Sequence, residues 1–283
     1  MSTLAFKRMV LGLPHSVGDY GGIDTAAVMA ETLGLDLLAA FIEDPGLLGL
    51  ADRPLARELR PLGAGWQPVD AARLSQEVQQ ATAAARRHFF DRVRTRNVAK
   101  QFHIARGPAA EMIASLVQPT DILVLLEPRH PADRITRQVA DLVEAAFLRA
   151  STILVVPCRI TRSHGPVVAF AAKPDDASIE TAAAVASAAK EHLIVLNASG
   201  RRLSAAEGAL SRNVPIEERM MPEPLADAAA IVSALASINE RLLVTPFTPF
   251  QYGDLQRIAS LRGIPVLVTG SKPHTTVTIN PGS

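Results

Sequence analysis

Apolar runs of five or six residues alternate along this chain with longer stretches in which apolar residues recur at helical spacing. Such runs between turn residues are typical of buried strands, and the longer stretches predict amphipathic helices. In the first half the predicted strands are 8–13, 37–42, 101–105, 121–126 and 152–156. The predicted helices are one capped by Asp24 or Thr25 and ended by Gly34, then about 52–60, 69–96 with Asp70 as cap, 108–118 and 133–149.

The second half repeats this alternation with fewer residues. Its predicted strands lie near 166–171, 193–197, 214–218, 241–245 and 264–268. Its predicted helices lie near 178–190, 202–211, 225–238 and 253–261. Strands that alternate with helices favour a parallel sheet with helices on both faces. The pattern therefore predicts an α/β protein built from two flavodoxin-like or Rossmann-like doubly wound sheets in tandem, each with five parallel strands.

An internal repeat supports two similar domains. Residues 23–38 (IDTAAVMAETLGLDLL) and 179–194 (IETAAAVASAAKEHLI) are identical at six of sixteen positions. Each copy follows an apolar run and a turn, and each leads into another apolar run. A repeat of this length indicates a duplicated domain rather than a solenoid of short units. We therefore expect a first domain over 1–160 and a shorter, degenerate second domain over 161–283.

Composition and charge narrow the functional classes. Residues 1–160 hold 18 basic and 17 acidic side chains, and residues 161–283 hold 11 of each, so neither half has the positive field that nucleic-acid binding requires. The single cysteine, Cys158, excludes an internal disulfide and favours a reducing compartment. The chain shows neither a signal peptide nor an apolar run long enough to span a membrane. We expect a cytoplasmic protein that binds neither nucleic acid nor membranes.

Ligands of open parallel sheets bind at the carboxyl ends of the strands, where the strand order reverses. In the first half, two loops are expected to meet at that place. One follows the first strand and holds Pro14, His15 and Ser16, and the other follows the strand 121–126 and holds Glu127 to His130.

Three segments resemble the universal stress protein family. They are Gly107-Pro108-Ala109-Ala110-Glu111-Met112-Ile113, Thr120-Asp121-Ile122-Leu123-Val124 and Ala150-Ser151-Thr152-Ile153-Leu154-Val155-Val156-Pro157. The family shows a G-x-P-A-x-x-I stretch, a D-x-I/L-V strand and a closing P-V-L-V-V-P. The chain is similar to tandem members, which carry two such domains. Family members commonly pair through the fifth strand, which here is residues 152–156 and 264–268. The resemblance therefore implies that the two domains pack as an internal pseudo-dimer, and it allows a homodimer through the same strands.

The resemblance also implies a ligand that this sequence does not suit. ATP-binding members carry G-x2-G-x9-G-[S/T] after the fourth strand, and counting back from Pro157 places these positions on Leu126, Arg129, Val139 and Ala140. Glycines let backbone N–H groups approach phosphates in conformations that side chains forbid. Because the loop length is kept while every glycine is replaced, we expect no ATP and no other cofactor to bind in the family's manner.

Other candidate residues surround the same loop. Arg129, His130, Arg134 and Arg137 form either an anion site built from side chains or a solvated helix face in which Asp133 pairs with Arg137. His15 and Ser16 offer half of a nucleophile pair but no G-x-S-x-G elbow, so turn residues are the simpler interpretation. The histidines never recur at i,i+4, and no metal site is predicted.

The leucine-rich connection 46–62 has two interpretations. Leu47, Leu50, Leu55 and Leu59 can share a face that either binds a partner or covers the helices of the same domain.

Three hypotheses of function remain. The first is a non-enzymatic stress-response or regulatory protein that acts through contacts with an unknown protein partner. The second is a small-molecule binding protein that takes an anionic ligand or nucleotide near residues 14–16 and 127–137. The third is an ATPase or hydrolase on the same scaffold, for which no paired carboxylates, catalytic triad or metal cluster is found.

Overall fold

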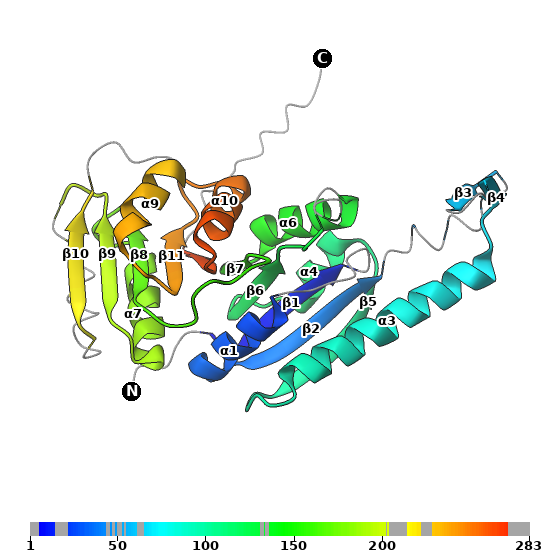
Figure 1. Ribbon diagram of the computed structural model, residues 1–283, viewed down its shortest axis with the longest axis horizontal. Coiled ribbons are helices and arrows are strands. Elements are labelled where there is room, and N and C mark those ends of the chain that lie inside the picture. The colour runs from blue at the N-terminus through cyan, green and yellow to red at the C-terminus, as the bar shows by residue number, and fades with distance from the viewer. Residues whose placement is uncertain are drawn as a thin grey trace, which may run out of the picture. The chain divides into compact units, whose positions relative to one another are not determined.

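The protein consists of two compact units. In the computed structural model, unit 1 comprises Met1–Ser163 with Ala259–Pro265, and unit 2 comprises His164–Ile258 with Val266–Ser283 (Figure 1). The structure describes residues 6–14, 22–43, 46, 49, 53, 55–60, 65–130, 133, 136–201, 203, 214–221 and 228–270.

Unit 1 contains a parallel sheet with the strand order β7-β6-β1-β2-β5. Its strands are β1 (Arg8–Pro14), β2 (Asp36–Glu43), β5 (Lys100–Arg106), β6 (Asp121–Leu126) and β7 (Ile153–Val156). The register places Gly12 of β1 between Ala40 of β2 and Leu125 of β6. β1, β2, β6 and β7 are buried along nearly their whole length, as expected for strands covered on both faces. The predicted α/β fold with parallel strands is confirmed.

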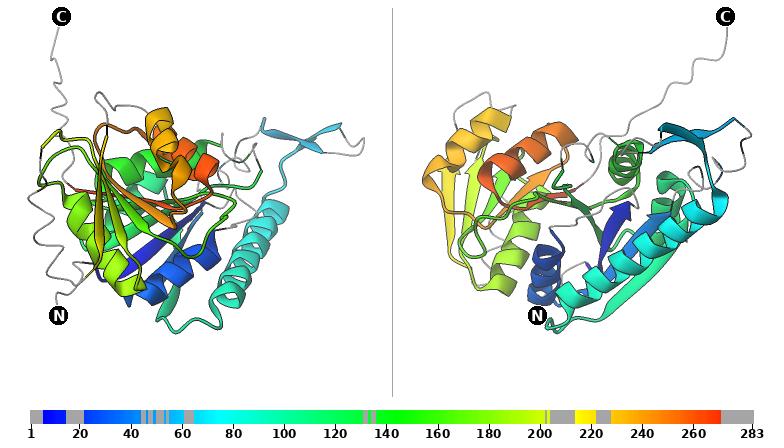
Figure 2. Two further views of the ribbon diagram at one scale, coloured as in Figure 1. Left: turned by 60° about the vertical axis from the view of Figure 1, so that its left-hand side comes forward. Right: turned by 45° about the vertical axis from the view of Figure 1, so that its right-hand side comes forward.

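Two pairs of helices cover this sheet. They are α1 (Ile23–Leu33) with α3 (Ala71–Val93), and α4 (Ala109–Leu116) with α6 (Arg137–Arg149). The two pairs lie on opposite faces (Figure 2). α6 begins at Arg137, later than the predicted start at 133. Alternate placement of helices on both faces follows from right-handed crossovers in a doubly wound sheet.

Local capping agrees with the sequence at some helix ends and differs at others. The Asp70 side chain accepts hydrogen bonds from Ala72 N and Arg73 N, as predicted for the start of α3. The predicted cap of α1 at Asp24 or Thr25 is wrong, because α1 already begins at Ile23 and its N-cap is Gly22, which has no side chain to cap it.

Charged side chains join α1 to α3. Arg92 Nη1 lies 3.1 Å from Asp24 Oδ2. The Glu31 carboxylate accepts a 2.9 Å hydrogen bond from the backbone N–H of Asn97 and pairs with Arg96 at 3.3 Å. The Asn97 hydrogen bond, together with Arg96, lowers the pKa of Glu31 from its usual 4.5.

The connection between β2 and α3 differs from the prediction. A helix over 52–60 is wrong, because Arg57–Arg60 forms strand β3, which pairs antiparallel with β4 (Gly65–Pro68). The leucine spacing at 55 and 59 suits a helix, but the residues at 65–68 supply a cross-strand partner that sequence spacing does not show. Leu55 is 92% exposed, so it does not cover its own domain. Leu47, Leu50 and the Leu59 side chain lie outside the described residues.

The described strands of unit 2 lie in the order β10-β9-β8-β11-β12. Read from the opposite edge, this is the order of unit 1, because β8 corresponds to β1 and β12 to β7. The strands are β8 (Val167–Ala171), β9 (Leu193–Asn197), β10 (Ile216–Met220), β11 (Leu242–Pro246) and β12 (Val266–Thr269). The described helices are α7 (Ala177–Ala189), α9 (Ala228–Ala234), the 3-10 turn η1 (Leu235–Ser237) and α10 (Tyr252–Arg262), of which the residues from Ala259 onward belong to unit 1. The predicted helix 202–211 lies almost entirely outside the described residues, and β10 begins two residues later than predicted.

The repeated segments adopt equivalent structures. Their shared apolar residues are buried in both copies: Ile23 and Ile179, Ala26 and Ala182, Ala27 and Ala183, Ala30 and Ala186. Each helix ends in a left-handed residue at the same place in the repeat, Gly34 with φ +66° and Lys190 with φ +56°. Both N–H groups donate to carbonyls three and four residues earlier, so the second copy keeps the helix end without the glycine.

Candidate functional site

The candidate site lies at the carboxyl ends of β1 and β6. These strands are neighbours along their length, from the pair Arg8 and Asp121 to the pair Gly12 and Leu125. β2 lies on the outer side of β1, and β7 lies on the outer side of β6, so the strand order reverses between β1 and β6. Such a reversal of strand order is where doubly wound sheets bind ligands.

The structure places only some of the predicted site residues. Pro14 ends β1 and is buried, and Arg129 and His130 follow β6 with exposed side chains. Of the other predicted site residues, His15, Ser16 and Arg134 lie outside the described residues, as does the side chain of Arg137 at the start of α6. Pro14 and Arg129 are thus at the same edge of the sheet, on adjacent strand ends, while the proposed pairing of Asp133 with Arg137 stays a prediction.

Leu126 fills the space between β6 and the start of α1. A Cβ atom on Gly22 would lie 2.8 Å from Leu126 Cδ2 and 2.8 Å from Val156 Cγ1, closer than real Cβ contacts allow. The two side chains thus pack directly against the Gly22 backbone, at the residue that caps α1. Leu126 is the first of the four positions that the resemblance to the family assigns to the glycine motif.

The remaining motif positions also carry side chains that suit packing or solvent. Val139 is buried on α6, and Ala140 is exposed. One turn further along α6, Leu142 packs against the sheet, because a Cβ atom on Gly12 would lie 2.9 Å from its two methyl carbons. Gly12 therefore permits close approach of α6 to β1.

A buried carboxylate, Glu127, follows Leu126. Its side chain is 2% exposed. Glu127 Oε2 accepts a 3.0 Å hydrogen bond from Cys158 N, and both carboxylate oxygens lie 3.1 Å from Ser260 Oγ, which donates to them. Ser260 belongs to Ala259–Pro265, the segment of the second half that is part of unit 1. These donors compensate the cost of burying the carboxylate and fix the loop after β6.

Sequence reasoning assigned no role to Glu127. The available signal was its position, because a charged residue that directly follows a buried run is often held by neighbouring backbone donors. Ser260 could not have been found, since it lies 133 residues away in the chain. A carboxylate at this edge is poorly suited to a phosphate group, because two anions repel each other more strongly where water is excluded.

A second buried carboxylate lies at the end of β2. Glu43 accepts hydrogen bonds from Thr82 Oγ1 at 2.8 Å and from Arg106 Nε at 2.7 Å. Both of its oxygens therefore have partners on α3 and β5, and Glu43 contributes to the packing of unit 1.

The equivalent edge of unit 2 is filled by aromatic and acidic side chains. Phe250, in the segment after β11, is buried and packs edge-on against Phe170 of β8, with 5.4 Å between ring centroids. At the start of α7, Asp176 accepts hydrogen bonds from Ala172 N at 3.2 Å and Ser178 N at 3.1 Å. The backbone donors that a helix N-terminus offers to an anion are here partly bound by the protein's own carboxylate.

Other kinds of site find little support in the described part of the chain. It holds no group of three or more histidine, cysteine, aspartate or glutamate residues that could bind a metal ion. Among the same residues, every helix is too short or too polar to cross a bilayer. Cys158 is partly exposed, and its backbone N–H donates to Glu127 Oε2.

Comparison with known proteins adds the fold relationship. The sequence matches no family model and no curated protein. The fold is similar to that of a universal stress protein from Archaeoglobus fulgidus DSM 4304, with 13% sequence identity, coverage of 95% of this chain and 98% of that one, and a TM-score of 0.62. A provisionally named universal stress protein from Pseudomonas aeruginosa UCBPP-PA14 shares 15% identity over 94% of each chain, with a TM-score of 0.50. The chain thus has the α/β fold found in universal stress protein structures.

Proposed function

We propose that the protein is a non-enzymatic stress-response or regulatory protein of the universal stress type, that it works in the cytoplasm, and that it acts through protein contacts. In this proposal it does not bind ATP in the family's manner and carries no other cofactor. The fold likeness supports the universal stress type.

The packing of Leu126 against Gly22 is the observation that carries the proposal. A phosphate-binding loop needs backbone N–H groups that a phosphate can approach closely. Here a leucine side chain occupies the first position assigned to the motif and, together with Val156 of β7, packs against Gly22 at the start of α1. The buried carboxylate of Glu127 is the next residue. Both features disfavour an anion at this edge of the sheet, one by volume and the other by charge.

Native mass spectrometry of the gently purified protein, with and without Mg-ATP, tests this proposal. We expect the bare protein mass in both samples. The control is a variant in which the motif is restored, Leu126→Gly with Arg129→Gly, Val139→Gly and Ala140→Ser, measured in the same way after its fold has been checked by circular dichroism. A nucleotide retained by the unmodified protein refutes the proposal.

A second function is supported by the exposed side chains of Arg129 and His130 beside the end of β6. Guanidinium and imidazole groups bind anions without glycine-rich backbone, so a small anionic ligand is the alternative to protein contacts alone. Titration calorimetry with phosphate, AMP and ATP tests it, with Arg129→Ala as the variant and Arg87→Ala, on the exposed side of α3, as the matched control. Affinity lost only in Arg129→Ala supports this function, and equal affinity in both variants refutes it.

A further inference from the structure

The β3–β4 hairpin stands apart from the sheet of unit 1. It extends beyond the N-terminal end of α3 in Figure 1 and in both views of Figure 2. It forms a two-stranded sheet of its own. A lone hairpin of this kind is at best marginally stable in water, so its position needs either an anchor or a partner.

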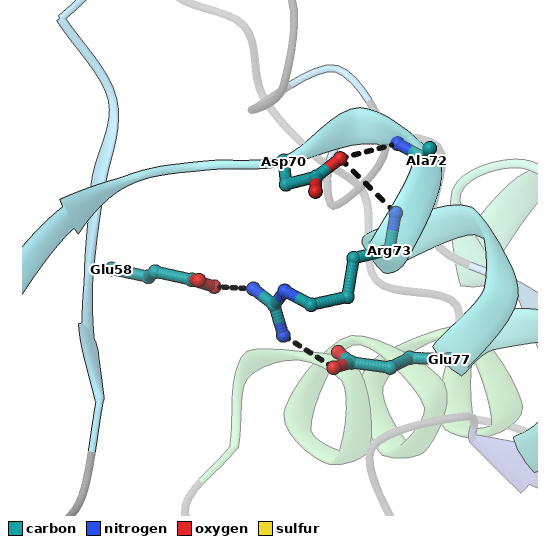
Figure 3. A network of polar contacts seen from close by, with 5 residues as sticks. All are labelled: Glu58, Asp70, Ala72, Arg73 and Glu77. Carbon is teal, nitrogen blue, oxygen red and sulfur yellow. Dashed lines mark hydrogen bonds and ion pairs between the residues drawn. The ribbon is translucent and has the colours of Figure 1, made fainter. Parts of the chain in front are cut away.

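Arg73 anchors the hairpin to α3 (Figure 3). Its guanidinium forms ion pairs with Glu58 of β3 and with Glu77 one turn further along the helix. Backbone contacts add to this, because Val69 N donates to Ala56 O at 3.2 Å and Asp70 caps the first turn of α3. The base of the hairpin is therefore held in a fixed direction, which lowers the entropy lost when it binds a partner.

The anchored hairpin presents apolar and basic side chains to solvent. Trp66, the only tryptophan in the chain, is 63% exposed, and Leu55 is 92% exposed. Arg53 and Arg57 of the same part of the chain are also exposed. Large exposed aromatic and aliphatic side chains on a rigid projection are typical of protein interfaces, and tryptophan with arginine is the usual composition of their central contacts.

A complementary surface lies on α6 of the same unit. Leu148 is 65% exposed, and Glu144 is exposed one helical turn before it, so the two side chains share a face. This face pairs an apolar residue with an acidic one, whereas the hairpin pairs apolar residues with basic ones.

We propose that the hairpin of one copy docks on the α6 face of a second copy and that the second copy returns the same contact. In this arrangement Trp66 packs on Leu148 of the other copy, and Arg57 pairs with its Glu144. Because both surfaces belong to unit 1, a twofold axis makes the contact twice and closes the assembly as a dimer. The inference rests on the proposed function in that both rely on protein contacts, and it names the partner as a second copy of this chain.

Sedimentation velocity of the full chain over a concentration series up to about 100 µM measures the dimer dissociation constant. We expect Arg57→Glu and Glu144→Arg each to raise it at least about tenfold, because each places two like-charge pairs in the dimer. The combination of both substitutions restores opposite charges and is expected to return the constant to within about threefold of its original value. Arg87→Glu, an exposed charge reversal on α3, is the matched control and is expected to leave the constant unchanged.

Trp66 provides an independent readout, because it is the only indole in the protein. Its emission is expected to shift to shorter wavelength as the concentration rises. In Glu144→Arg the midpoint of this shift should lie at a concentration at least about tenfold higher. Trp66→Ala is expected to raise the dissociation constant about a hundredfold, since each copy loses a central contact.

A chain that stays monomeric over the whole series overturns the inference, as does a dimer that the charge reversals do not weaken. The latter result would point instead to the fifth strands, and either result leaves the proposed function standing with a different partner surface. Retention of nucleotide in the mass spectrometry experiment has the opposite effect, because it removes the proposed function without affecting the dimer.

Discussion

Gly22→Ala tests whether Leu126 fills the edge of the sheet. Gly22 has φ −95° and ψ 1°, values that alanine also adopts, so the substitution brings no backbone penalty from a left-handed conformation. The new Cβ atom would lie 2.8 Å from both Leu126 Cδ2 and Val156 Cγ1. Overpacking of this kind costs about 1–3 kcal/mol. We therefore expect Gly22→Ala to lower the free energy of unfolding by about 2 kcal/mol, including a small loss from the poorer N-cap.

A double-mutant cycle with Leu126→Ala isolates the steric part. Removing the leucine takes away one of the two close contacts, so the penalty for Gly22→Ala should fall by about 1 kcal/mol in that background. Gly253→Ala in α10 is the control, because an added Cβ meets nothing within 4 Å there. It is expected to raise stability by about 0.5–1 kcal/mol.

Urea unfolding, followed by circular dichroism, measures the four proteins of the cycle and the control. The two units can unfold separately, so the cycle is read from the transition that Gly22→Ala moves. If Gly22→Ala raises stability as Gly253→Ala does, or if the coupling with Leu126→Ala is zero, Leu126 does not occupy this space. The main support for the proposed loss of ATP binding would then be gone.

Three further predictions follow from other contacts. Gly34→Lys is expected to lower the free energy of unfolding by about 1 kcal/mol, and Lys190→Gly to raise it by a similar amount, because both positions have positive φ. Shifts of the melting temperature with the same sign in both variants would contradict this. Ser260→Ala should lower the free energy of unfolding by about 1–2 kcal/mol, because it removes a donor from the buried Glu127 carboxylate. Glu127→Gln in the same background should recover part of this loss. If chemical denaturation shows no loss in Ser260→Ala, the contact does not stabilise the protein. The pKa of Glu31 is lowered in the folded protein, so its contribution to stability is present above pH 4.5 and is lost as pH falls through the folded pKa. Glu31→Gln should therefore reduce the loss of unfolding free energy at acid pH. An unchanged loss in this variant counts against the prediction.

Much of the scaffold was predictable because local and repeating signals determine it. Buried parallel strands require continuous apolar runs, and each run in unit 1 became a strand within one or two residues of its predicted bounds. Asp70 and Gly34 fixed helix ends through contacts within one turn, which sequence spacing shows directly. The hairpin at 57–68 was not predictable in this way, because the pairing of Arg57–Arg60 with Gly65–Pro68 competes with a helical leucine pattern of similar strength.

The candidate site also has features that the sequence predicts and features that it does not. The sequence by itself determined the alternation of strands and helices and the internal repeat, because these depend on residue type and spacing. It also led to the expectation that the glycines of the phosphate-binding pattern are replaced. Only the tertiary structure decided what occupies the edge of the sheet. Leu126 packs on Gly22, and Ser260 donates to Glu127 from 133 residues away. Contacts between distant segments depend on the crossing of the chain in three dimensions, and no local pattern encodes which side chain fills a given space.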